Sequence, residues 1–229
     1  MITVVMSTYS PTPGSPREDY ARRAVEALGK YLHSPVPLRL HVADDGSADG
    51  SYLRDLLRIS HLYGWQEGSI TVANRKGIGG SLNRALALSQ PAIWLYTTDD
   101  WLLTAPLDLT QPIKLLDTYG LLRIGPTHPN LACHTRFRED IGWWLEIDAR
   151  AGGFAFATRI FLATWRFYEA IGPFDEGLNA YETERLYAER VKAVAERDGQ
   201  SGLIAQIGTQ SLAGPWEHLG EFEVGTIQP

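Results

Sequence analysis

The chain has 229 residues, of which 44% are hydrophobic and 21% charged, an ordinary composition for a globular protein. The length suits one domain, so residues 1–229 are expected to fold as a single unit. The formal net charge of -6 argues against binding to duplex nucleic acid or to an anionic membrane. A single cysteine excludes an internal disulfide, and the sequence shows no signal peptide and no apolar run of about 20 residues, so a cytoplasmic protein is expected.

Strand-like and helix-like segments alternate through the first half of the chain. The strand-like apolar runs are Ile2–Met6, Leu38–Val42, Ile70–Ala73 and Ala92–Tyr96. A capping box of Ser15 and Glu18 predicts the start of the first helix, and further helices are expected after Asp49 or Ser51 and from Gly77. This alternation predicts an α/β fold of three layers, α/β/α, with a mainly parallel central sheet.

The second half is less regular. We expect helices over Thr110–Tyr119, Ile160–Ile171 and Tyr181–Arg197 and a short strand over Leu121–Ile124. The segment His128–Ala149 has no clear period and is expected to fold over the ligand crevice. Arg136, Arg138 and Arg159 are candidates for contact with a diphosphate, and at most one of the adjacent Trp143 and Trp144 can form a platform for a sugar ring.

Two Asp pairs directly follow predicted strands. Asp44-Asp45 comes after the second strand, and Asp99-Asp100 comes after the fourth. In an open α/β sheet, ligands bind outside the carboxyl ends of the strands, so both pairs should face one crevice. Carboxylates this close repel one another unless a cation or hydrogen-bond donors offset their charge. Mn²⁺ or Mg²⁺ together with a phosphate-bearing ligand would meet that demand.

The first Asp pair and the glycine-rich segment also have simpler explanations. Asp44 or Asp45 can accept from a nucleobase or a ribose, but the turn Asp44–Asp49 also contains ordinary helix-capping residues. The glycine-rich segment Asn74–Arg84 can present backbone N–H groups to an anion, and close helix–sheet packing explains it equally well. Leu82 stands at the third glycine position, so this segment is not a dinucleotide fingerprint.

The order of these motifs resembles glycosyltransferase family 2. The resemblance rests on Ile2–Tyr9, Asp44–Ser47, Asp99–Trp101 and the segment containing Asn74, Gly77 and Asn83-Arg84. It continues more loosely through Gly152–Phe154, Gly172–Glu176, Glu182–Arg190 and His218–Gly220. It implies a GT-A fold with a nucleotide-sugar-binding half, residues 1–104, and an acceptor-binding half with a C-terminal tail, residues 105–229.

The resemblance also implies roles for individual residues. Thr8 and Tyr9 would border the base, Asp44 would bond it with Asp45 nearby, and Asp99 would belong to an Asp-x-Asp-like element. Asp100 would be the preferred metal ligand, and a late histidine, His218, would complete the metal shell. The remaining nucleotide contacts would come from Asn74, Gly77 and Asn83. Thr98 departs from the family pattern, because an acidic residue usually stands there.

Inverting transfer needs a general base within hydrogen-bond reach of the acceptor hydroxyl. Counting back from Arg190, the resemblance places Glu184 at the position of that base, with Glu182 as the alternative and Thr183 where a second acid is usual. Both Glu side chains could instead simply face the helix dipole.

The sequence thus predicts a metal-dependent inverting glycosyltransferase that moves one sugar from a nucleotide diphosphate sugar to an acceptor hydroxyl. UDP-sugar is the expected donor and Mn²⁺ or Mg²⁺ the expected ion. The acceptor could be a glycan, a protein or a small molecule, and the oligomeric state is not predicted. A nucleotidyltransferase and a non-catalytic nucleotide- or glycan-binding domain remain alternatives.

Overall fold

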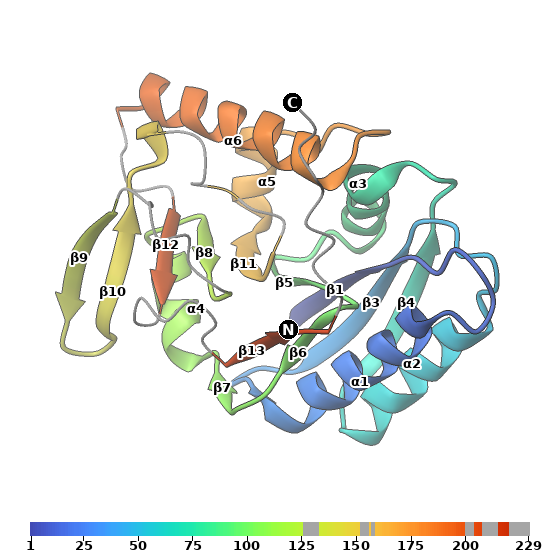
Figure 1. Ribbon diagram of the computed structural model, residues 1–229. Helices are drawn as coiled ribbons and strands as arrows, with labels where there is room; N and C mark the ends of the chain where they lie inside the picture. Colours follow the sequence, from blue (N-terminus) through green and yellow to red (C-terminus); the bar gives the residue numbers. More distant parts are fainter. Residues whose placement is uncertain (126–132, 152–155, 157–158, 200–203, 208–214, 220–229) are drawn as a thin grey trace.

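A computed structural model describes the chain except for residues 126–132, 152–155, 157–158, 200–203, 208–214 and 220–229 (Figure 1). The elements of the first half are β1 (Ile2–Thr8), α1 (Pro16–Tyr31), β2 (Leu32–His33), β3 (Leu38–Asp44), α2 (Ser51–Leu62), β4 (Gln66–Val72), α3 (Gly77–Ser89), β5 (Ile93–Thr98) and β6 (Trp101–Leu103). Those that follow are β7 (Leu107–Asp108), α4 (Thr110–Leu116), β8 (Leu121–Arg123), β9 (Cys133–Arg138), β10 (Gly142–Ile147), the 3-10 turn η1 (Ala149–Ala151), β11 (Phe161–Thr164), α5 (Trp165–Ile171), α6 (Ala180–Arg197), β12 (Ile204–Ile207) and β13 (Trp216–His218).

The central sheet has the strand order β4-β3-β1-β5-β11-β8-β12-β10-β9. Strands β4, β3, β1 and β5 are parallel, as expected, and β11 then runs antiparallel to both β5 and β8. Strand β12 is parallel to β8, and the β9–β10 hairpin closes the far end in antiparallel pairing. The sheet is therefore mixed, with its parallel part formed by the first half of the chain.

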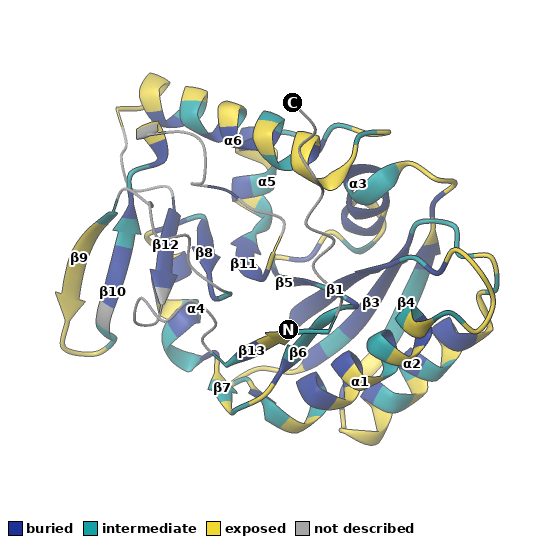
Figure 2. Ribbon diagram, in the orientation of Figure 1, coloured by how far each residue is buried: buried dark blue, intermediate teal, exposed yellow. Residues whose placement is uncertain are grey.

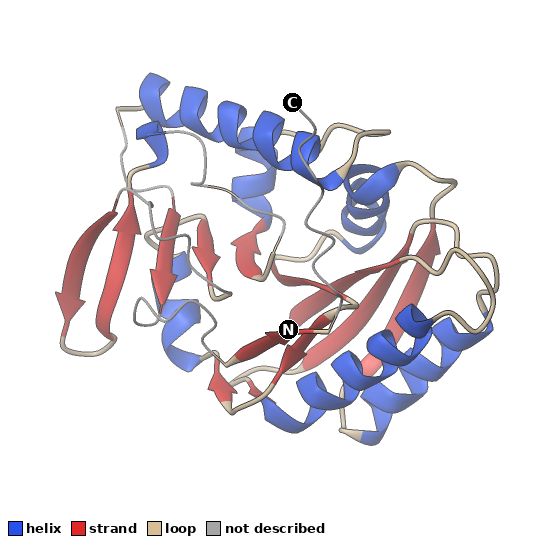
Figure 3. Cartoon of the chain, in the orientation of Figure 1, coloured by secondary structure: helices blue, strands red, loops and turns tan. Residues whose placement is uncertain are grey.

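Helices cover both faces of the sheet, which gives the expected three layers (Figure 3). Side chains of α1, α2 and α4 pack with Val4, Met6 and Leu95 in one hydrophobic cluster. Side chains of α3, α5 and α6 pack with Val5 and Tyr96 in the other. Strands β1, β3 and β5 are buried on both faces (Figure 2), which explains their continuous apolar runs.

The expected helix over Ile160–Ile171 is in fact a strand followed by a helix. Phe161–Thr164 forms β11, with Leu162 in one hydrophobic cluster and Phe161 in the other, as a strand buried on both faces requires. The side chain of Thr164 then accepts from the N–H of Phe167 and caps α5. The helix expected over Thr110–Tyr119 likewise ends earlier, at Leu116.

The described part of His128–Ala149 does not fold over the crevice. It forms the β9–β10 hairpin, and β9 is the outermost strand of the sheet. In the hairpin, Arg136 pairs with Glu146, and Arg138 pairs with Asp140. No helix in the described part of the chain combines the length and apolar character that crossing a bilayer requires.

Candidate active site

The carboxyl ends of β1, β3 and β5 lie side by side and carry the candidate site. Thr8 at the end of β1 is in register with Asp44 on β3, and Ser7 is in register with Thr98 on β5. The N–H of Asp99 donates to the carbonyl of Ser7 at 3.1 Å, which extends the pairing past the end of β5. Both Asp pairs therefore stand at the same sheet edge, as predicted.

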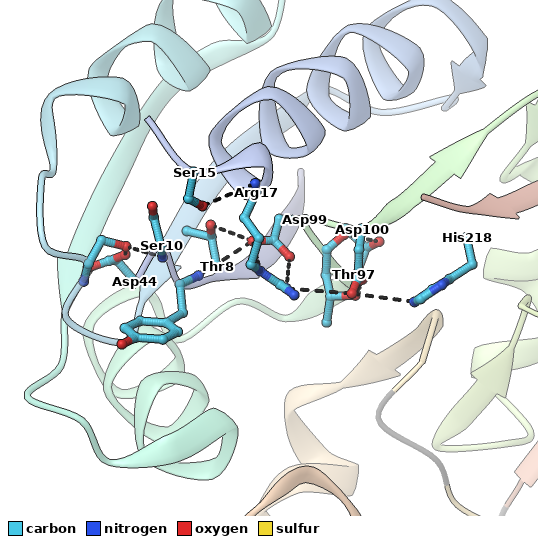
Figure 4. Close-up of polar contacts among 12 residues, drawn as sticks. Thr8, Ser10, Ser15, Arg17, Asp44, Thr97, Asp99, Asp100 and His218 are labelled. Atoms are coloured by element: carbon cyan, nitrogen blue, oxygen red, sulfur yellow. Dashed lines mark hydrogen bonds and ion pairs between the residues drawn. The ribbon is translucent and has the colours of Figure 1, made fainter. Parts of the chain in front are cut away.

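Asp99 is fully buried beneath this edge. Its carboxylate accepts from the hydroxyl of Thr8 at 2.8 Å and forms an ion pair with the guanidinium of Arg17 (Figure 4). Burial raises the pKa of Asp99 to about 6, and the charge of Arg17 opposes that shift. The structure thus places the Asp99 carboxylate against protein partners, whereas its predicted contact with the nucleotide has no support in this geometry.

Arg17 is a site residue that the sequence reasoning missed. It lies in the first turn of α1, beside the N-cap Ser15, and its Nη2 is also 3.5 Å from Oδ2 of Asp100. The amino-terminal turn of a helix favours acidic residues, because the helix dipole is positive there. An arginine in the first turn of the helix that follows the first strand is therefore unusual, and this is the signal that could have identified Arg17.

Asp100 is more accessible than Asp99, with 16% of its side chain exposed. Oδ2 of Asp100 lies 3.4 Å from Nε2 of His218, as Figure 4 shows on the side away from Arg17. His218 belongs to β13, which pairs with β6, and the N–H of Leu219 donates to the carbonyl of Asp100. The hydroxyl of Thr98 donates to Oδ1 of Asp100 and thereby orients the carboxylate. The structure therefore brings together the two predicted metal ligands.

The donor set of Asp100 and His218 fits a divalent metal that also binds phosphate. Within the described residues, no three His, Cys, Asp or Glu side chains converge on one point. Two protein ligands suffice where diphosphate oxygens and water fill the other positions, as is usual for Mg²⁺. Carboxylate oxygen and imidazole nitrogen are both acceptable to Mn²⁺.

The first Asp pair organises two turns. The carboxylate of Asp44 accepts from the N–H groups of Gly46 and Ser47, each at 2.9 Å, and from the Ser47 hydroxyl. Asp44 is 1% exposed, so its carboxylate is not accessible for the predicted bond to the base. The carboxylate of Asp45 accepts from the N–H groups of Lys76 and Gly77 at 2.8 and 3.0 Å, and so connects the end of β3 to the start of α3.

A cavity of about 150 Å³ opens between the two Asp pairs. The residues that line it are Ser7, Thr8, Tyr9, Arg17, Asp45, Ile78, Ser81 and Thr98. The guanidinium of Arg75 lies 4.4 Å from the centre of the Tyr9 ring and holds that ring beside the cavity. Two of the predicted base contacts, Thr8 and Tyr9, therefore border a cavity. Of the first Asp pair, Asp45 lines this cavity and Asp44 does not.

The predicted contacts Asn74, Gly77 and Asn83 do not line this cavity. Asn74 is exposed. Gly77 has a φ of +68°, and a Cβ there would lie 2.5 Å from the carbonyl oxygen of Leu178, which explains the glycine by backbone packing. The side chain of Asn83 bonds to both the N–H and the carbonyl of Phe174. Gly77 and Asn83 thus hold α3 against the loop before α6.

The two candidate bases differ in their surroundings. Glu182 is exposed on the first turn of α6, whereas Glu184 is half-buried. The charge of Glu184 acts on the hydroxyl of Tyr96 on β5 and on the guanidinium of Arg123 on β8, so Glu184 lies within electrostatic range of both strands. Burial raises the pKa of Tyr96 well above its ordinary value, and the nearby charges of Asp100, Glu184 and Asp99 add to the shift.

The proposed aromatic platform is not formed by Trp144. This side chain is buried, and its Nε1 donates to the hydroxyl of Tyr119 at 3.0 Å. The side chain of Trp143 lies outside the described part of the chain. The predicted anion contacts Arg136 and Arg138 belong to the outermost hairpin, whereas Arg159 lies close enough to Arg123 to affect its pKa.

Comparison with solved structures identifies the architecture. Over 90% of its length the chain superposes on TarS from S. aureus, with a TM-score of 0.62 and 17% sequence identity. It matches glucosyl-3-phosphoglycerate synthase from Mycobacterium tuberculosis, solved with Mg²⁺ and UDP, over 96% of its length with a TM-score of 0.58 and 17% identity. The chain has the fold of the GT-A glycosyltransferases.

The chain spans 35% of the length of TarS and 72% of the length of the synthase. A mannosyltransferase from Pyrobaculum calidifontis, solved with GDP-Man and Mn²⁺, matches 92% of this chain and 58% of its own, with a TM-score of 0.52 and 18% identity. No protein-family model and no curated protein matches the sequence. The similarity therefore lies in the fold.

Proposed function

We propose that the chain is a nucleotide-sugar-dependent glycosyltransferase that transfers one sugar with inversion. The observation that carries the proposal is the arrangement of charge around the second Asp pair. Arg17 and His218 stand on either side of Asp100, and the charge of Glu184 reaches Tyr96 on β5, the strand that leads to this pair. Cationic donors and a metal-binding pair would hold a diphosphate, and a carboxylate on the acceptor side would accept a proton.

We infer the position of each part of the donor from the cavity and the charges around it. The nucleoside lies beside Tyr9 and Asp45, and the diphosphate extends toward Arg17 and Asp100. Mn²⁺ or Mg²⁺ held by Asp100 and His218 would offset the diphosphate charge and stabilise the leaving group. The three structural neighbours named above include proteins solved with UDP or GDP-Man and with Mg²⁺ or Mn²⁺, which supports this class of donor. We propose UDP-sugar as the donor.

Glu184 acts on the acceptor. Its carboxylate takes the proton of the acceptor hydroxyl while that oxygen attacks the anomeric carbon of the sugar. The bond from the anomeric carbon to the diphosphate breaks, and the nucleoside diphosphate departs with the electron pair. The attack comes from the side opposite the leaving group, so the anomeric configuration inverts. The half-buried position of Glu184 favours it over the exposed Glu182 for this role.

A thermal-shift experiment tests the proposal. UDP-, GDP- and dTDP-sugars are added with and without Mn²⁺, and a ligand that binds the folded state raises the melting temperature by mass action. We expect a metal-dependent shift with one donor, and slow release of nucleoside diphosphate from it. Asp100→Asn should abolish both, whereas Asp140→Asn, an exposed aspartate of the β9–β10 hairpin, should leave both intact.

The outcomes separate the alternatives. Absence of a metal-dependent shift with every nucleotide sugar would contradict the proposal. Binding of a donor without any release or transfer of sugar would instead identify a non-catalytic nucleotide-binding domain. Release of pyrophosphate from a nucleoside triphosphate would identify a nucleotidyltransferase.

A further inference from the structure

A buried tyrosine hydroxyl connects two strand ends next to the proposed donor site. Tyr52 lies in the first turn of α2 and is fully buried. Its hydroxyl is 2.9 Å from Oγ1 of Thr8 and 3.0 Å from Oγ of Ser47. Thr8 ends β1, Ser47 belongs to the turn that follows β3, and these two strands are neighbours in the sheet. One side chain of α2 thus bridges both strand ends.

The contacts continue on both sides of Tyr52 and end at two carboxylates. The hydroxyl of Thr8 donates to Asp99 at 2.8 Å, and the hydroxyl of Ser47 donates to Asp44. Three hydroxyls, those of Ser47, Tyr52 and Thr8, therefore connect one Asp pair to the other, and we call them the hydroxyl chain. Figure 4 shows Thr8 between Asp44 and Asp99, the two ends of this chain.

The hydroxyl chain has fewer protons than contacts. It makes four contacts, two with carboxylates and two between hydroxyls, while each of its three hydroxyls supplies one proton. Thr8 and Ser47 donate theirs to carboxylates, so the Tyr52 proton serves the two inner contacts alone. Burial raises the pKa of Tyr52 to about 12, so it keeps this proton at neutral pH. Removing the Tyr52 hydroxyl would leave both neighbours bonded to their carboxylates.

At one end the hydroxyl chain holds the side chains that position Arg17. Asp99 accepts from Nε of Arg17 at 3.3 Å and forms an ion pair with Nη2 of the same residue. Thr8 and Arg17 both line the cavity. A threonine hydroxyl with two partners is held in one rotamer. Tyr52 therefore fixes the Thr8 side chain and, through Asp99, the guanidinium that faces the proposed diphosphate.

At the other end the hydroxyl chain orders the turn that carries Asp45. Ser47 donates to one carboxylate oxygen of Asp44, and the other oxygen accepts from the N–H groups of Gly46 and Ser47. Asp45 lies within this turn and lines the nucleoside end of the cavity. Tyr52 is thus connected to both of the turns that a bound donor would span.

We propose that Tyr52 is a positioning residue that aligns the nucleoside subsite with the diphosphate subsite. The inference rests on the proposed function and adds the residue that holds its two halves in register. The donor would bridge the two turns on the cavity side, whereas Tyr52 bridges them on the buried side through Thr8 and Ser47. A ligand whose two parts are covalently joined needs this alignment, because both parts must fit at once. Each part alone does not need it.

Separate and joined parts of the donor test the inference. The nucleoside of the preferred donor, pyrophosphate and the corresponding nucleoside diphosphate are each used to inhibit donor hydrolysis with Mn²⁺ present. Tyr52→Phe should weaken inhibition by the nucleoside diphosphate at least about tenfold, because a misplacement of about 1 Å can cost about 100-fold. Inhibition by the nucleoside or by pyrophosphate should change less than about threefold, which corresponds to less than about 0.7 kcal/mol.

Tyr119→Phe is the matched control. Tyr119 is also buried, and its hydroxyl also has two side-chain partners, since it accepts from Nε1 of Trp144 and donates to Glu146. This variant leaves a buried N–H unpaired, so it should lose at least as much thermal stability as Tyr52→Phe while all three inhibition constants stay unchanged. The melting temperature of Tyr52→Phe should fall by about 2–4 °C, the effect of one lost hydrogen bond in a protein of this size.

A second variant interrupts the hydroxyl chain from the nucleoside side. Ser47→Ala removes the hydroxyl that lies between Tyr52 and Asp44, so it should reproduce the selective loss of nucleoside diphosphate inhibition. The double variant Tyr52→Phe with Ser47→Ala should lose less than the product of the two separate effects, because contacts within one network are not independent.

Two kinds of result would overturn the inference. An unchanged inhibition constant for the nucleoside diphosphate in Tyr52→Phe, with normal hydrolysis, would remove the positioning role and leave the proposed function intact. Equal weakening of all three inhibitors, or of one part alone, would assign the hydroxyl to general stability or to a single subsite. Absence of donor binding and hydrolysis in the unmodified protein would contradict the proposed function itself, and is thereby distinguishable.

Discussion

Nε2 of His218 lies 3.4 Å from Oδ2 of Asp100, so a residue of the last described strand meets the turn that follows β5. The pairing of β13 with β6 and the bond from Leu219 to the Asp100 carbonyl hold this contact in place. The segment that carries His218 therefore belongs to the proposed donor site.

The first prediction concerns metal affinity. His218→Gln removes one of two protein ligands, so the Mn²⁺ concentration that gives half of the thermal shift with UDP should rise by at least about tenfold. His61→Gln, an exposed histidine on α2, is the matched control and should not change it. Equal Mn²⁺ dependence in both variants would exclude His218 from the metal site.

The second prediction separates the two candidate bases. Glu184→Gln should lower kcat for transfer by about 10²–10⁴ while donor affinity is kept, because general base catalysis contributes about that much. Glu182→Gln should stay near the activity of the unmodified protein, since this side chain is exposed. Steady-state transfer rates and calorimetric donor binding measure both quantities. The reverse pattern would move the base to Glu182.

The third prediction concerns the ion pair of Arg17 and Asp99. Arg17→Gln leaves the buried carboxylate with Thr8 and the weaker contact of the Tyr9 N–H, and should destabilise the protein by about 1–3 kcal/mol. Asp99→Asn should reduce the free energy of unfolding less in the Arg17→Gln protein than in the unmodified protein. In the Arg17→Gln protein the buried carboxylate of Asp99 has already lost its cation, so removing its charge breaks no ion pair. A double-mutant cycle by urea unfolding measures the coupling. Strictly additive effects would show that the pair contributes nothing.

A fourth prediction follows from a buried histidine on β3. His41 is fully buried between the hydroxyls of Ser69 and Thr71, and burial followed by the charge of Arg39 lowers its pKa to about 4. The unfolded chain, with a pKa near 6.5, binds more protons between these values. The stability that His41 contributes is therefore complete above pH 6.5 and is lost as the pH falls toward 4, by at most about 1.4 kcal/mol per pH unit.

His41→Gln provides the comparison, because it can bond to the same hydroxyls but does not titrate. Urea unfolding at pH 7, 6 and 5 should show the unmodified protein losing stability more steeply than the variant. Parallel pH dependences would mean that His41 titrates normally in the folded state.

The fifth prediction tests the packing of α3. Alanine in place of a helical glycine normally stabilises by up to about 1 kcal/mol. At Gly79, however, a Cβ would lie 2.1 Å from the carbonyl oxygen of Asp175, so Gly79→Ala should lower the melting temperature. Gly50→Ala, where the nearest contact is a Leu53 methyl at 3.4 Å, should change it little. Equal melting temperatures would show that the loop at Asp175 moves away at no cost.

The sequence was most informative where strands are buried on both faces. The apolar runs leading to Asp44 and Asp99 predicted β3 and β5 and placed both Asp pairs at one edge, because parallel strands end together. The same criterion failed for Phe161–Thr164, since a short apolar run before a helix has no period that separates strand from helix. The pairing of this segment with β5 and β8 in the folded protein makes it a strand.

Individual roles were harder to predict than positions. Capping and ligand binding use the same residue types, so the sequence could not show that Asp44 bonds to its own turn. Arg17 was missed because its contacts, Asp99 and Asp100, are far away in the chain. The resemblance implied that Asp100 and His218 lie close together, and no local sequence pattern around His218 indicates this.

The bond pattern of Asp45 has a consequence for how the donor binds. Its carboxylate already connects the end of β3 to the first residues of α3, so the two loops that flank the nucleoside cavity are fixed before any ligand arrives. Donor binding then needs little ordering of the backbone there, and less of the interaction energy is lost to entropy. The nucleoside end of the proposed donor site is thus preorganised by a contact that belongs to the fold itself.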